Sequence, residues 1–313
     1  MAFKNRSVFK LLLDLSIIMT LSYLVICILI FFKLAAVVPG HGDHHRNSPL
    51  AISWNTKSLT GPIKHYDSIR FPSQLPDVML DGWFMQHPSS NKIVIITHGY
   101  NSSKHEPALI KTAWLLFRHG YSVLMYDLHN HGSSTIIDGR TALGAREYLD
   151  VLGAKQACLQ LGFTPDAILY YGLSMGAVST LIAAQYDTDI TTIISQASFS
   201  DPNLIMKEEF NRKKIPLFLY HGSILIANHL FRFPIGTKSP LDLASTNLST
   251  LLVIHSIHDH RVGYHHAQLL MNYAEKANIT YTELVLDSTE HVDTIFKYEN
   301  SFSSFFNRYL PRI

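Results

Sequence analysis

The hydrophobic positions of this chain form one long N-terminal run followed by many short runs. Residues 11–32 read LLLDLSIIMTLSYLVICILIFF and contain a single charge, Asp14. At about 1.5 Å per residue, a helix of this length spans the roughly 30 Å hydrocarbon layer, and its apolar side chains outweigh one aspartate near its end. A cleaved signal peptide has a shorter apolar core of about 7 to 15 residues, and only AAVV at 35–38 resembles a cleavage site. We therefore predict a retained membrane anchor over residues 11–32.

The charges beside this run predict its orientation. Lys4, Arg6 and Lys10 precede it, whereas Lys33 and Arg46 follow it. Because positive residues concentrate on the cytoplasmic side of a membrane, this bias favours a cytoplasmic N-terminus and a body on the far side.

The remaining pattern divides the chain into a tail at 1–10, the anchor, a linker at 33–60 and a folded body at 61–313. The linker contains PGHGDHHRNSP, a polar stretch rich in glycine, proline and histidine. Its histidines are loosely spaced and have no cysteine or acidic cluster nearby, so we expect solvated side chains there rather than a metal site.

Short β-rich runs alternate with helical segments through the body. Runs at 68–73 and 78–86, with little between them, predict two antiparallel strands at a sheet edge. Further strands are predicted at 92–99, 121–128, 167–174, 191–198, 251–259 and 279–287, and helices at 106–120, 145–162, 176–185, 264–277 and 291–310. This alternation predicts an α/β fold with a doubly wound, mostly parallel sheet. It breaks at about 203–238, where two or three amphipathic helical pieces and no strand are expected.

Composition excludes some classes of function. The net charge is +2 with basic residues scattered along the chain, so we expect no nucleic-acid partner. Cys27 lies in the apolar run and Cys158 in a helical pattern, a placement that favours neither a disulfide nor a metal site.

Three residues follow strands in a chemically meaningful order. Ligands of such sheets bind beyond the carboxyl ends of the strands, and Ser174, Asp259 and His291 occupy such positions. A serine nucleophile needs a base, and a histidine base needs a carboxylate that fixes its tautomer. Asp201 and Asp287 are the alternative carboxylates. His258 and His260 flank Asp259 and could suggest a metal, but alternate residues in a loop are more often solvated, and zinc chemistry would leave Ser174 unexplained.

The order of serine, acid and histidine, with the serine in Gly172-Leu173-Ser174-Met175-Gly176 between a strand and a helix, resembles the α/β-hydrolase superfamily. The resemblance covers about residues 65–312, and the nearest branch is the bacterial hydrolases with one N-terminal membrane span. Other segments that resemble family motifs are HGYN at 98–101, DLHNHGSS at 127–134, SPLD at 239–242 and HSIHDHRV at 255–262. Departures from the family pattern are His129 and Asn130 in place of Arg-Gly, Ser256 in place of glycine, and Ser-Thr-Glu at 288–290 before His291.

The resemblance implies a mechanism and a set of roles. Ser174 would attack an acyl carbonyl, His291 would relay the proton, and Asp259 would orient His291. Gly172 and Gly176 would permit the sharp turn at the serine, and the backbone N–H groups of Tyr100 and Met175 would form the oxyanion hole. The helical insertion at about 203–238 would be a cap, and neither a metal nor an organic cofactor would be needed.

The expected substrate is an ester, acyl or lipid-like, because the predicted cap is rich in apolar residues. Peptide cleavage or thioester hydrolysis by the same three residues is an alternative, although no propeller-sized domain accompanies the body. A noncatalytic binding module is the third possible function. Asn101-Ser102-Ser103 is a glycosylation acceptor pattern beside the expected oxyanion loop, where a glycan would crowd the site. This favours the periplasmic face of a bacterial inner membrane over the lumen of the endoplasmic reticulum.

Overall fold

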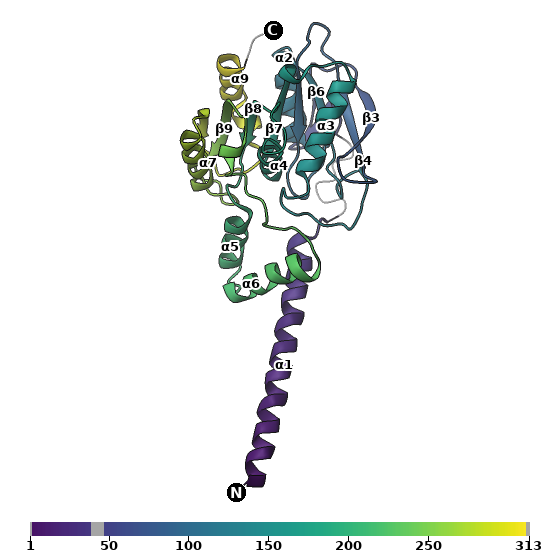
Figure 1. Ribbon diagram of the computed structural model, residues 1–313. Coiled ribbons are helices and arrows are strands. Elements are labelled where there is room, and N and C mark those ends of the chain that lie inside the picture. The colour runs from purple at the N-terminus through teal and green to yellow at the C-terminus, as the bar shows by residue number, and fades with distance from the viewer. Residues whose placement is uncertain (1, 39–46, 311–313) are drawn as a thin grey trace.

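A body of strands and helices sits at one end of a single long helix (Figure 1). The computed structural model describes residues 2–38 and 47–310, with side chains from residue 8 onward. Residues 39–46 of the predicted linker, which include His41, His44, His45 and Arg46, lie outside the described residues. The long helix, α1, covers Ala2–Ala35 and contains the whole of the predicted anchor.

The body is built on a sheet of eight strands in the order β10-β9-β8-β7-β5-β6-β4-β3. Their bounds are β3 Asp67–Pro72, β4 Met79–Met85, β5 Ile93–Thr97, β6 Ser122–Tyr126, β7 Ile168–Leu173, β8 Thr192–Gln196, β9 Thr250–Ser256 and β10 Thr280–Leu286. Only β4 runs against its neighbours, since it pairs antiparallel with both β3 and β6. The structure confirms the mostly parallel sheet and the antiparallel pair at its edge.

Helices cover both faces of the sheet because successive strand side chains point to opposite faces. In β5, Ile93 and Ile95 pack into one apolar layer, while Val94 and Ile96 pack into the other. The first layer is closed by α3 (Tyr148–Gln160), α4 (Met175–Ala183) and α7 (His265–Lys276). The second is closed by α2 (Pro107–Arg118), α8 (Thr294–Lys297) and α9 (Glu299–Tyr309). Short 3-10 turns lie at η1 (Pro165–Ala167) and η3 (Leu243–Ser245).

Part of the predicted linker belongs to the body, which corrects the boundary at residue 60. Residues 51–60 form an antiparallel hairpin of β1 (Ala51–Trp54) and β2 (Lys57–Thr60). Ile52 is buried in the layer closed by α2, and the Trp114 indole N–H donates to the Pro49 carbonyl at 2.6 Å. Residues 51–60 read as a linker in the sequence because the packing partners of their apolar side chains, such as Phe296 against Trp54, lie far along the chain.

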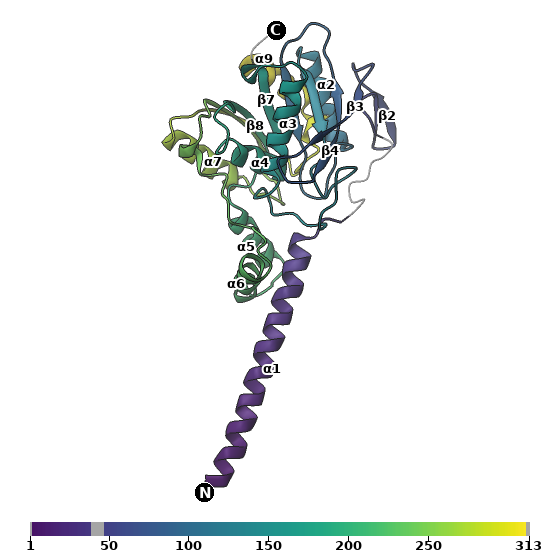
Figure 2. The same ribbon diagram turned by 45° about the vertical axis from the view of Figure 1, so that its right-hand side comes forward.

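The insertion after β8 is helical, with α5 (Pro202–Arg212), α6 (Leu217–Leu225) and the π-helical turn η2 (Ile226–Leu230). We call residues 202–238 the cap segment. It lies beside the last turns of α1 in both views (Figures 1 and 2). Phe31 and Ala35 of α1 are buried in one cluster with Phe210 and Tyr220 of the cap segment. The end of α1 is therefore packed as part of the folded protein.

The rest of α1 projects away from the body (Figure 2). Its described side chains from Val8 to Ser22 are all exposed, and most are apolar. By length and composition, the stretch Val8–Ala35 is able to cross a membrane. A signal sequence near an N-terminus has the same properties.

Candidate active site

Ser174 lies at a sharp turn between β7 and α4. Its backbone has φ 54° and ψ −118°, a conformation that costs energy for any residue with a β-carbon. Its N–H donates to the Gln196 carbonyl at 2.8 Å, which helps to hold the turn. A β-carbon on Gly172 would lie 2.3 Å from the Ala177 Cα, and one on Gly176 would lie 2.2 Å from the Thr97 carbonyl oxygen. The two glycines thus allow β7, α4 and β5 to approach closely enough to hold the serine in this strained conformation.

A histidine and a carboxylate lie next to this serine. His291 Nε2 is 3.0 Å from Ser174 Oγ, and His291 Nδ1 is 2.6 Å from Asp259 Oδ2. The three side chains follow the carboxyl ends of β7, β9 and β10, which lie at the same edge of the sheet because these strands are parallel. In this arrangement Asp259 accepts a hydrogen bond from the His291 Nδ1–H group. The Nε2 lone pair is therefore available to accept the serine proton.

Asp259 is held as an anion by its surroundings. Burial by itself would raise its pKa, but the hydrogen bond to His291 and the N–H groups of Val262 and Arg261 lower it overall. Those N–H groups donate to Oδ1 at 2.9 and 2.8 Å, respectively. One carboxylate oxygen therefore fixes the loop and the other faces the histidine.

The alternative carboxylates have other positions. Asp201 caps the start of α5, where its Oδ1 accepts from the Leu204 N–H at 2.9 Å. Asp287 has a side chain that is 90% exposed and faces His258 at 3.5 Å. His260 is also exposed, so the histidines that flank Asp259 are surface residues.

The expected oxyanion donors lie on two segments that meet at Ser174. A β-carbon on Gly99 would lie 3.3 Å from the Ser174 Cβ, so the segment that carries Tyr100 passes directly beside the serine. Within the described part of the chain, the backbone N–H groups of Tyr100 and Met175 donate no hydrogen bond. The Tyr100 hydroxyl donates to the Ala36 carbonyl at 2.6 Å, which ties this segment to the end of α1.

Buried polar contacts join the segments that lie next to the site. Asp127 forms an ion pair with Lys104 and accepts from the Ser133 N–H at 2.9 Å. His98 Nε2 accepts from the Leu128 N–H at 3.0 Å, and burial lowers the pKa of His98 to about 3. The segments at 98–101 and 127–134 that resemble family motifs are thus joined to each other.

A cavity of about 530 Å³ opens beside Ser174. Its lining is Lys33, Leu34, Tyr100, Leu143, Ser174, Phe199, Ile205, Met206, Glu209, Arg212, Lys213, His260, Arg261 and Val262. Sequence reasoning did not select Lys33 or the basic residues at 212, 213 and 261. The adjacent basic residues at 212–214 were visible in the sequence, but their proximity to Ser174 was not.

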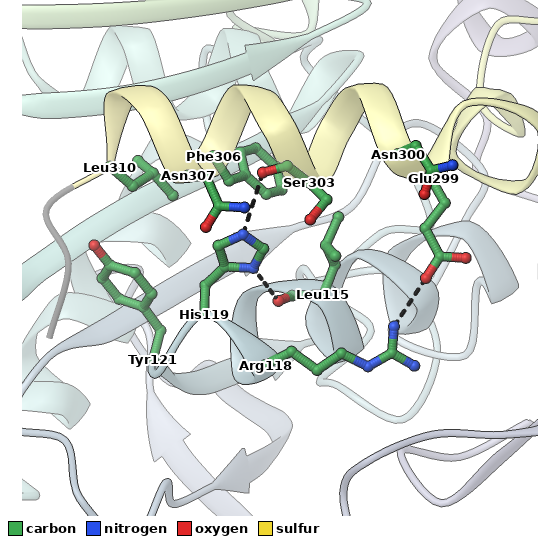
Figure 3. Close-up of a pocket in the computed structure, with 10 residues that line it drawn as sticks. All are labelled: Leu115, Arg118, His119, Tyr121, Glu299, Asn300, Ser303, Phe306, Asn307 and Leu310. Atoms are coloured by element: carbon green, nitrogen blue, oxygen red, sulfur yellow. Dashed lines mark hydrogen bonds and ion pairs between the residues drawn. The ribbon is translucent and has the colours of Figure 1, made fainter.

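A second cavity, of about 590 Å³, lies between α2 and α9 (Figure 3). It is at the amino ends of the strands, since Tyr121 in its wall directly precedes β6. Its polar groups contact one another: the two ring nitrogens of His119 face the carbonyls of Leu115 and Ser303, and Arg118 pairs with Glu299. This hollow shares no lining residue with the Ser174 cavity.

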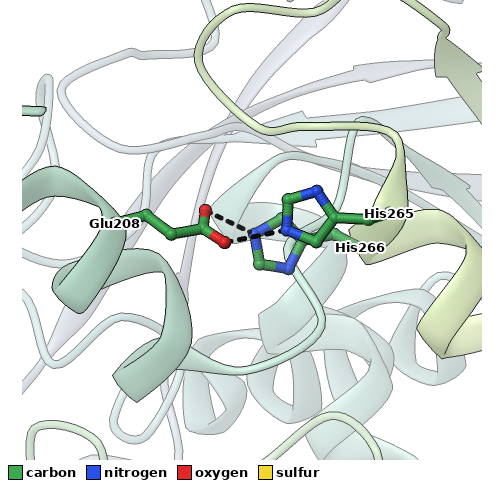
Figure 4. A group of neighbouring side chains, drawn as sticks. All are labelled: Glu208, His265 and His266. Carbon is green, nitrogen blue, oxygen red and sulfur yellow. Dashed lines mark hydrogen bonds and ion pairs between the residues drawn. The ribbon is translucent and has the colours of Figure 1, made fainter. Parts of the chain in front are cut away.

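Glu208, His265 and His266 form the candidate metal-binding group of the described chain (Figure 4). The Ser200 N–H donates to His266 Nδ1 at 3.1 Å, so a neutral His266 carries its proton on Nε2, which faces Glu208. Burial lowers the pKa of His266, which favours this neutral form. A metal would need the lone pair of Nε2, and the group is better explained as a hydrogen-bonded contact between α5 and α7.

The sheet, the strained serine and its histidine define a serine hydrolase of the α/β-hydrolase superfamily. Residues 111–311 match the model of the prolyl oligopeptidase family. The chain therefore belongs to the prolyl oligopeptidase family. No curated protein matches the chain.

Solved structures with the same fold include esterases and peptidases. An esterase from Pyrococcus furiosus superposes with a TM-score of 0.62 at 22% identity, over 79% of this chain and 92% of the esterase. An α/β-hydrolase from a Penicillium species has a TM-score of 0.58 at 17% identity, over 79% of this chain and 96% of its own. An acylaminoacyl peptidase from Pyrococcus horikoshii has a TM-score of 0.58 at 18% identity, over 81% of this chain and 45% of the peptidase. At these identities the likeness concerns the fold.

Proposed function

We propose that this chain is a membrane-anchored serine esterase in which Ser174, His291 and Asp259 are the catalytic residues. The observation that carries the proposal is the unbroken contact from Asp259 Oδ2 through His291 to Ser174 Oγ, at 2.6 and 3.0 Å. A serine hydroxyl is otherwise a weak nucleophile near neutral pH, and this contact supplies both a base and its orienting carboxylate.

The reaction follows from these contacts. Ser174 Oγ attacks the acyl carbonyl while His291 Nε2 takes its proton, and the carbonyl oxygen becomes an oxyanion held by the N–H groups of Tyr100 and Met175. The tetrahedral intermediate collapses, the alcohol leaves with the proton from His291, and an acyl-enzyme remains. Water then attacks with His291 again as base, and release of the acid restores the Ser174 hydroxyl. Asp259 stays ionised and stabilises the imidazolium.

An ester with an apolar acyl chain is favoured by the surroundings of Ser174. Leu143, Phe199, Ile205, Met206 and Val262 line the cavity. The cap segment also exposes Phe218 and Leu225 at 61% and 63%, and the Phe218 ring stacks on Tyr23 of α1, inside the predicted span. Family membership makes peptide cleavage the second candidate.

The burial of α1 residues supports a retained anchor. Cleavage after α1 would remove Phe31 and Ala35 from their cluster with the cap segment, and would remove Lys33 and Leu34 from the cavity wall. We infer one span with the body on the far side of the membrane, at the periplasmic face of a bacterial inner membrane, because positive charges are concentrated before residue 11. Cell fractionation and protease digestion of cells with a permeabilised outer membrane test this orientation. We expect the protease to degrade the body. A body that is degraded only after the inner membrane is also opened would contradict the orientation.

Reaction with a fluorophosphonate probe tests the nucleophile. We expect the full chain in nonionic detergent to be labelled, and Ser174→Ala to lose labelling and about 10⁴- to 10⁶-fold of kcat. Ser58→Ala on the exposed strand β2 is the matched control and should behave as wild type. Folded wild-type protein that stays unlabelled would exclude the proposed serine chemistry.

The substrate bond is tested with paired esters, thioesters and amides of the same acyl groups, graded in chain length. We expect kcat/KM to be highest for an ester and to rise with acyl length. Faster turnover of a matched peptide amide would assign the protein to the peptidases instead.

Contact of the cap segment with the membrane is tested separately. Replacing Phe218 and Leu225 by serine should lower turnover of a bilayer-embedded ester by about tenfold, because apolar side chains in the interface hold the cap there. Turnover of a short soluble ester should change far less. Leu161→Ser, an exposed leucine at the end of α3, is the control, and equal losses in both variants would contradict the proposed contact.

A further inference from the structure

The mouth of the Ser174 cavity has an excess of positive charge that ester cleavage does not use. Lys33 comes from the last turns of α1, Arg212 and Lys213 from the cap segment, and Arg261 from the loop after Asp259. Glu209 is the carboxylate among the residues that line this cavity. Four cations thus converge on one opening from three separate segments of the chain.

Glu209 offsets only part of this charge. Its carboxylate pairs with Arg212 at 2.7 Å and with Lys213 at 2.8 Å. Burial by itself would raise the pKa of Glu209, but Lys213, Arg212 and Arg261 lower it, so the group remains a single negative charge. The Arg212 guanidinium also donates to the His260 carbonyl at 3.3 Å, which holds the cap against the loop that follows Asp259.

Lys33 and Arg261 have exposed side chains at this opening. Within residues 8–38 and 47–310, neither forms an ion pair with a carboxylate. Arg261 is also the residue whose backbone N–H donates to Asp259, at 2.8 Å, so its guanidinium is attached next to the catalytic acid. The formal charge of the lining is +3 with His260 neutral, since four cations face one carboxylate.

We propose that these cations form a subsite for an anionic group on the substrate, either a phosphate or a carboxylate, joined to the ester that Ser174 cleaves. The inference rests on the proposed function and names the substrate class as an anionic amphiphile. Guanidinium and ammonium groups bind such anions through charge-assisted hydrogen bonds.

The apolar wall of the same cavity explains why the anion belongs to an amphiphile. Leu34, Phe199 and Met206 line the cavity that also carries the cations. A free inorganic anion would leave that wall in contact with water, whereas a chain with a charged end would satisfy both surfaces. Lys33 at the end of α1 places the cationic side of the cavity near the head-group level of a membrane.

Protection of Ser174 from the fluorophosphonate probe tests the subsite without requiring turnover. The full chain is labelled in maltoside micelles that contain octyl phosphate or octanol at equal mole fraction, or with inorganic phosphate in the buffer. We expect octyl phosphate to slow labelling about tenfold more than octanol does, because the contacts are charged but partly exposed. Inorganic phosphate alone should have little effect.

Charge-removing variants locate the effect. Arg261→Gln should reduce the advantage of octyl phosphate to about threefold, and Arg261→Gln with Lys33→Gln should abolish it, because Arg212 and Lys213 are paired with Glu209. Arg70→Gln, an exposed arginine on β3 away from the cavity, is the matched control and should retain the wild-type advantage.

Three outcomes would overturn the subsite: equal protection by octanol and octyl phosphate, unchanged protection in the double variant, or equal protection by inorganic phosphate. The second outcome would assign the effect to the charge of the micelle surface, and the third to a free-anion site. If folded wild-type protein is not labelled at all, the proposed function itself fails, and the subsite fails with it. Labelling without selectivity contradicts the subsite alone.

Discussion

Two histidine–aspartate pairs lie in the body, each with its histidine in the segment after a strand, and the distance between their bonded atoms is the same. His291 Nδ1 is 2.6 Å from Asp259, and His129 Nδ1 is 2.6 Å from Asp150. The difference lies in the second ring nitrogen. In His291 it faces Ser174 Oγ at 3.0 Å, whereas in His129 it is buried without a hydrogen-bond partner among the described residues.

Exposure separates the two pairs further. The His291 side chain is 12% exposed, and both side chains of the other pair are 0% exposed. Burial by itself would lower the pKa of His129, but the charge of Asp150 and its hydrogen bond raise it overall. Asp150 also accepts from the Ser73 hydroxyl at 2.6 Å and the His129 N–H at 2.9 Å. A paired histidine is therefore a candidate base only when its other nitrogen meets a group that can react.

The largest expected effect comes from breaking the pair of His291 and Asp259. Asp259→Asn should lower kcat by about 10⁴-fold, because an amide cannot hold the required tautomer or stabilise the imidazolium. Ester turnover and the rate of fluorophosphonate labelling measure this.

Asp201→Asn is the matched control for that exchange. Its carboxylate caps α5, so the variant should lose at most about 1 kcal/mol of stability and keep its turnover. If Asp201→Asn is inactive while Asp259→Asn is active, the assignment of the acid is wrong.

The buried pair should show the opposite response. Asp150→Asn should lower the free energy of unfolding by about 3 kcal/mol, because an amide cannot accept all the hydrogen bonds that the buried carboxylate receives from Ser73 and His129. Urea denaturation measures the loss, and labelling of the folded protein should proceed at the wild-type rate.

If Asp150→Asn does not fold, a milder substitution tests the contribution of the Asp150 carboxylate to stability. Ser73→Ala removes one hydrogen bond to Asp150 and should cost about 1 kcal/mol. A large loss of turnover in a folded Asp150 variant would mean that the buried pair acts in catalysis, contrary to the comparison drawn above.

A third histidine, His98, sharpens the comparison because its ring has no carboxylate hydrogen-bond partner in the described part of the chain. His98 is buried and neutral, with a pKa lowered to about 3 from the ordinary 6.5. Between these values the unfolded chain binds a proton that the folded chain does not. The contribution of His98 to stability is therefore fully present above pH 6.5 and is lost progressively as the pH falls toward 3.

The corresponding measurement is the free energy of unfolding against pH for wild type and His98→Gln. In this window the wild-type slope should be steeper by about 1.4 kcal/mol per pH unit, the value for one proton. Parallel profiles would show that His98 is not the group that titrates. Carboxylates also titrate in this pH range in both the wild type and His98→Gln. Only the difference between the two slopes is therefore assigned to His98.

Much of the fold could be predicted from local patterns. The near-continuous apolar runs at 92–99 and 167–174 predict buried parallel strands, and β5 and β7 lie within them. The hairpin at 51–60 could not be predicted, because its stability depends on Ile52 packing against a helix far along the chain. The helix α1 extends beyond the predicted span of 11–32 at both ends, to Ala2 and Ala35.

The sequence by itself determined which residues could do chemistry and in what order they follow their strands: Ser174 between two glycines, then Asp259, then His291. It also determined an N-terminal run long enough to span a membrane. Local patterns carry this information because strand alternation, tight turns and helix length depend on neighbouring residues.

Only the tertiary structure decided which groups meet. Asp259, rather than Asp201 or Asp287, faces His291, and the similar pair of His129 and Asp150 is sealed in the core. Lys33 and Arg261, more than two hundred residues apart, line one cavity. Such contacts form because a parallel sheet and its cap bring the ends of distant strands together. A local sequence pattern does not show which of these ends lie close in space.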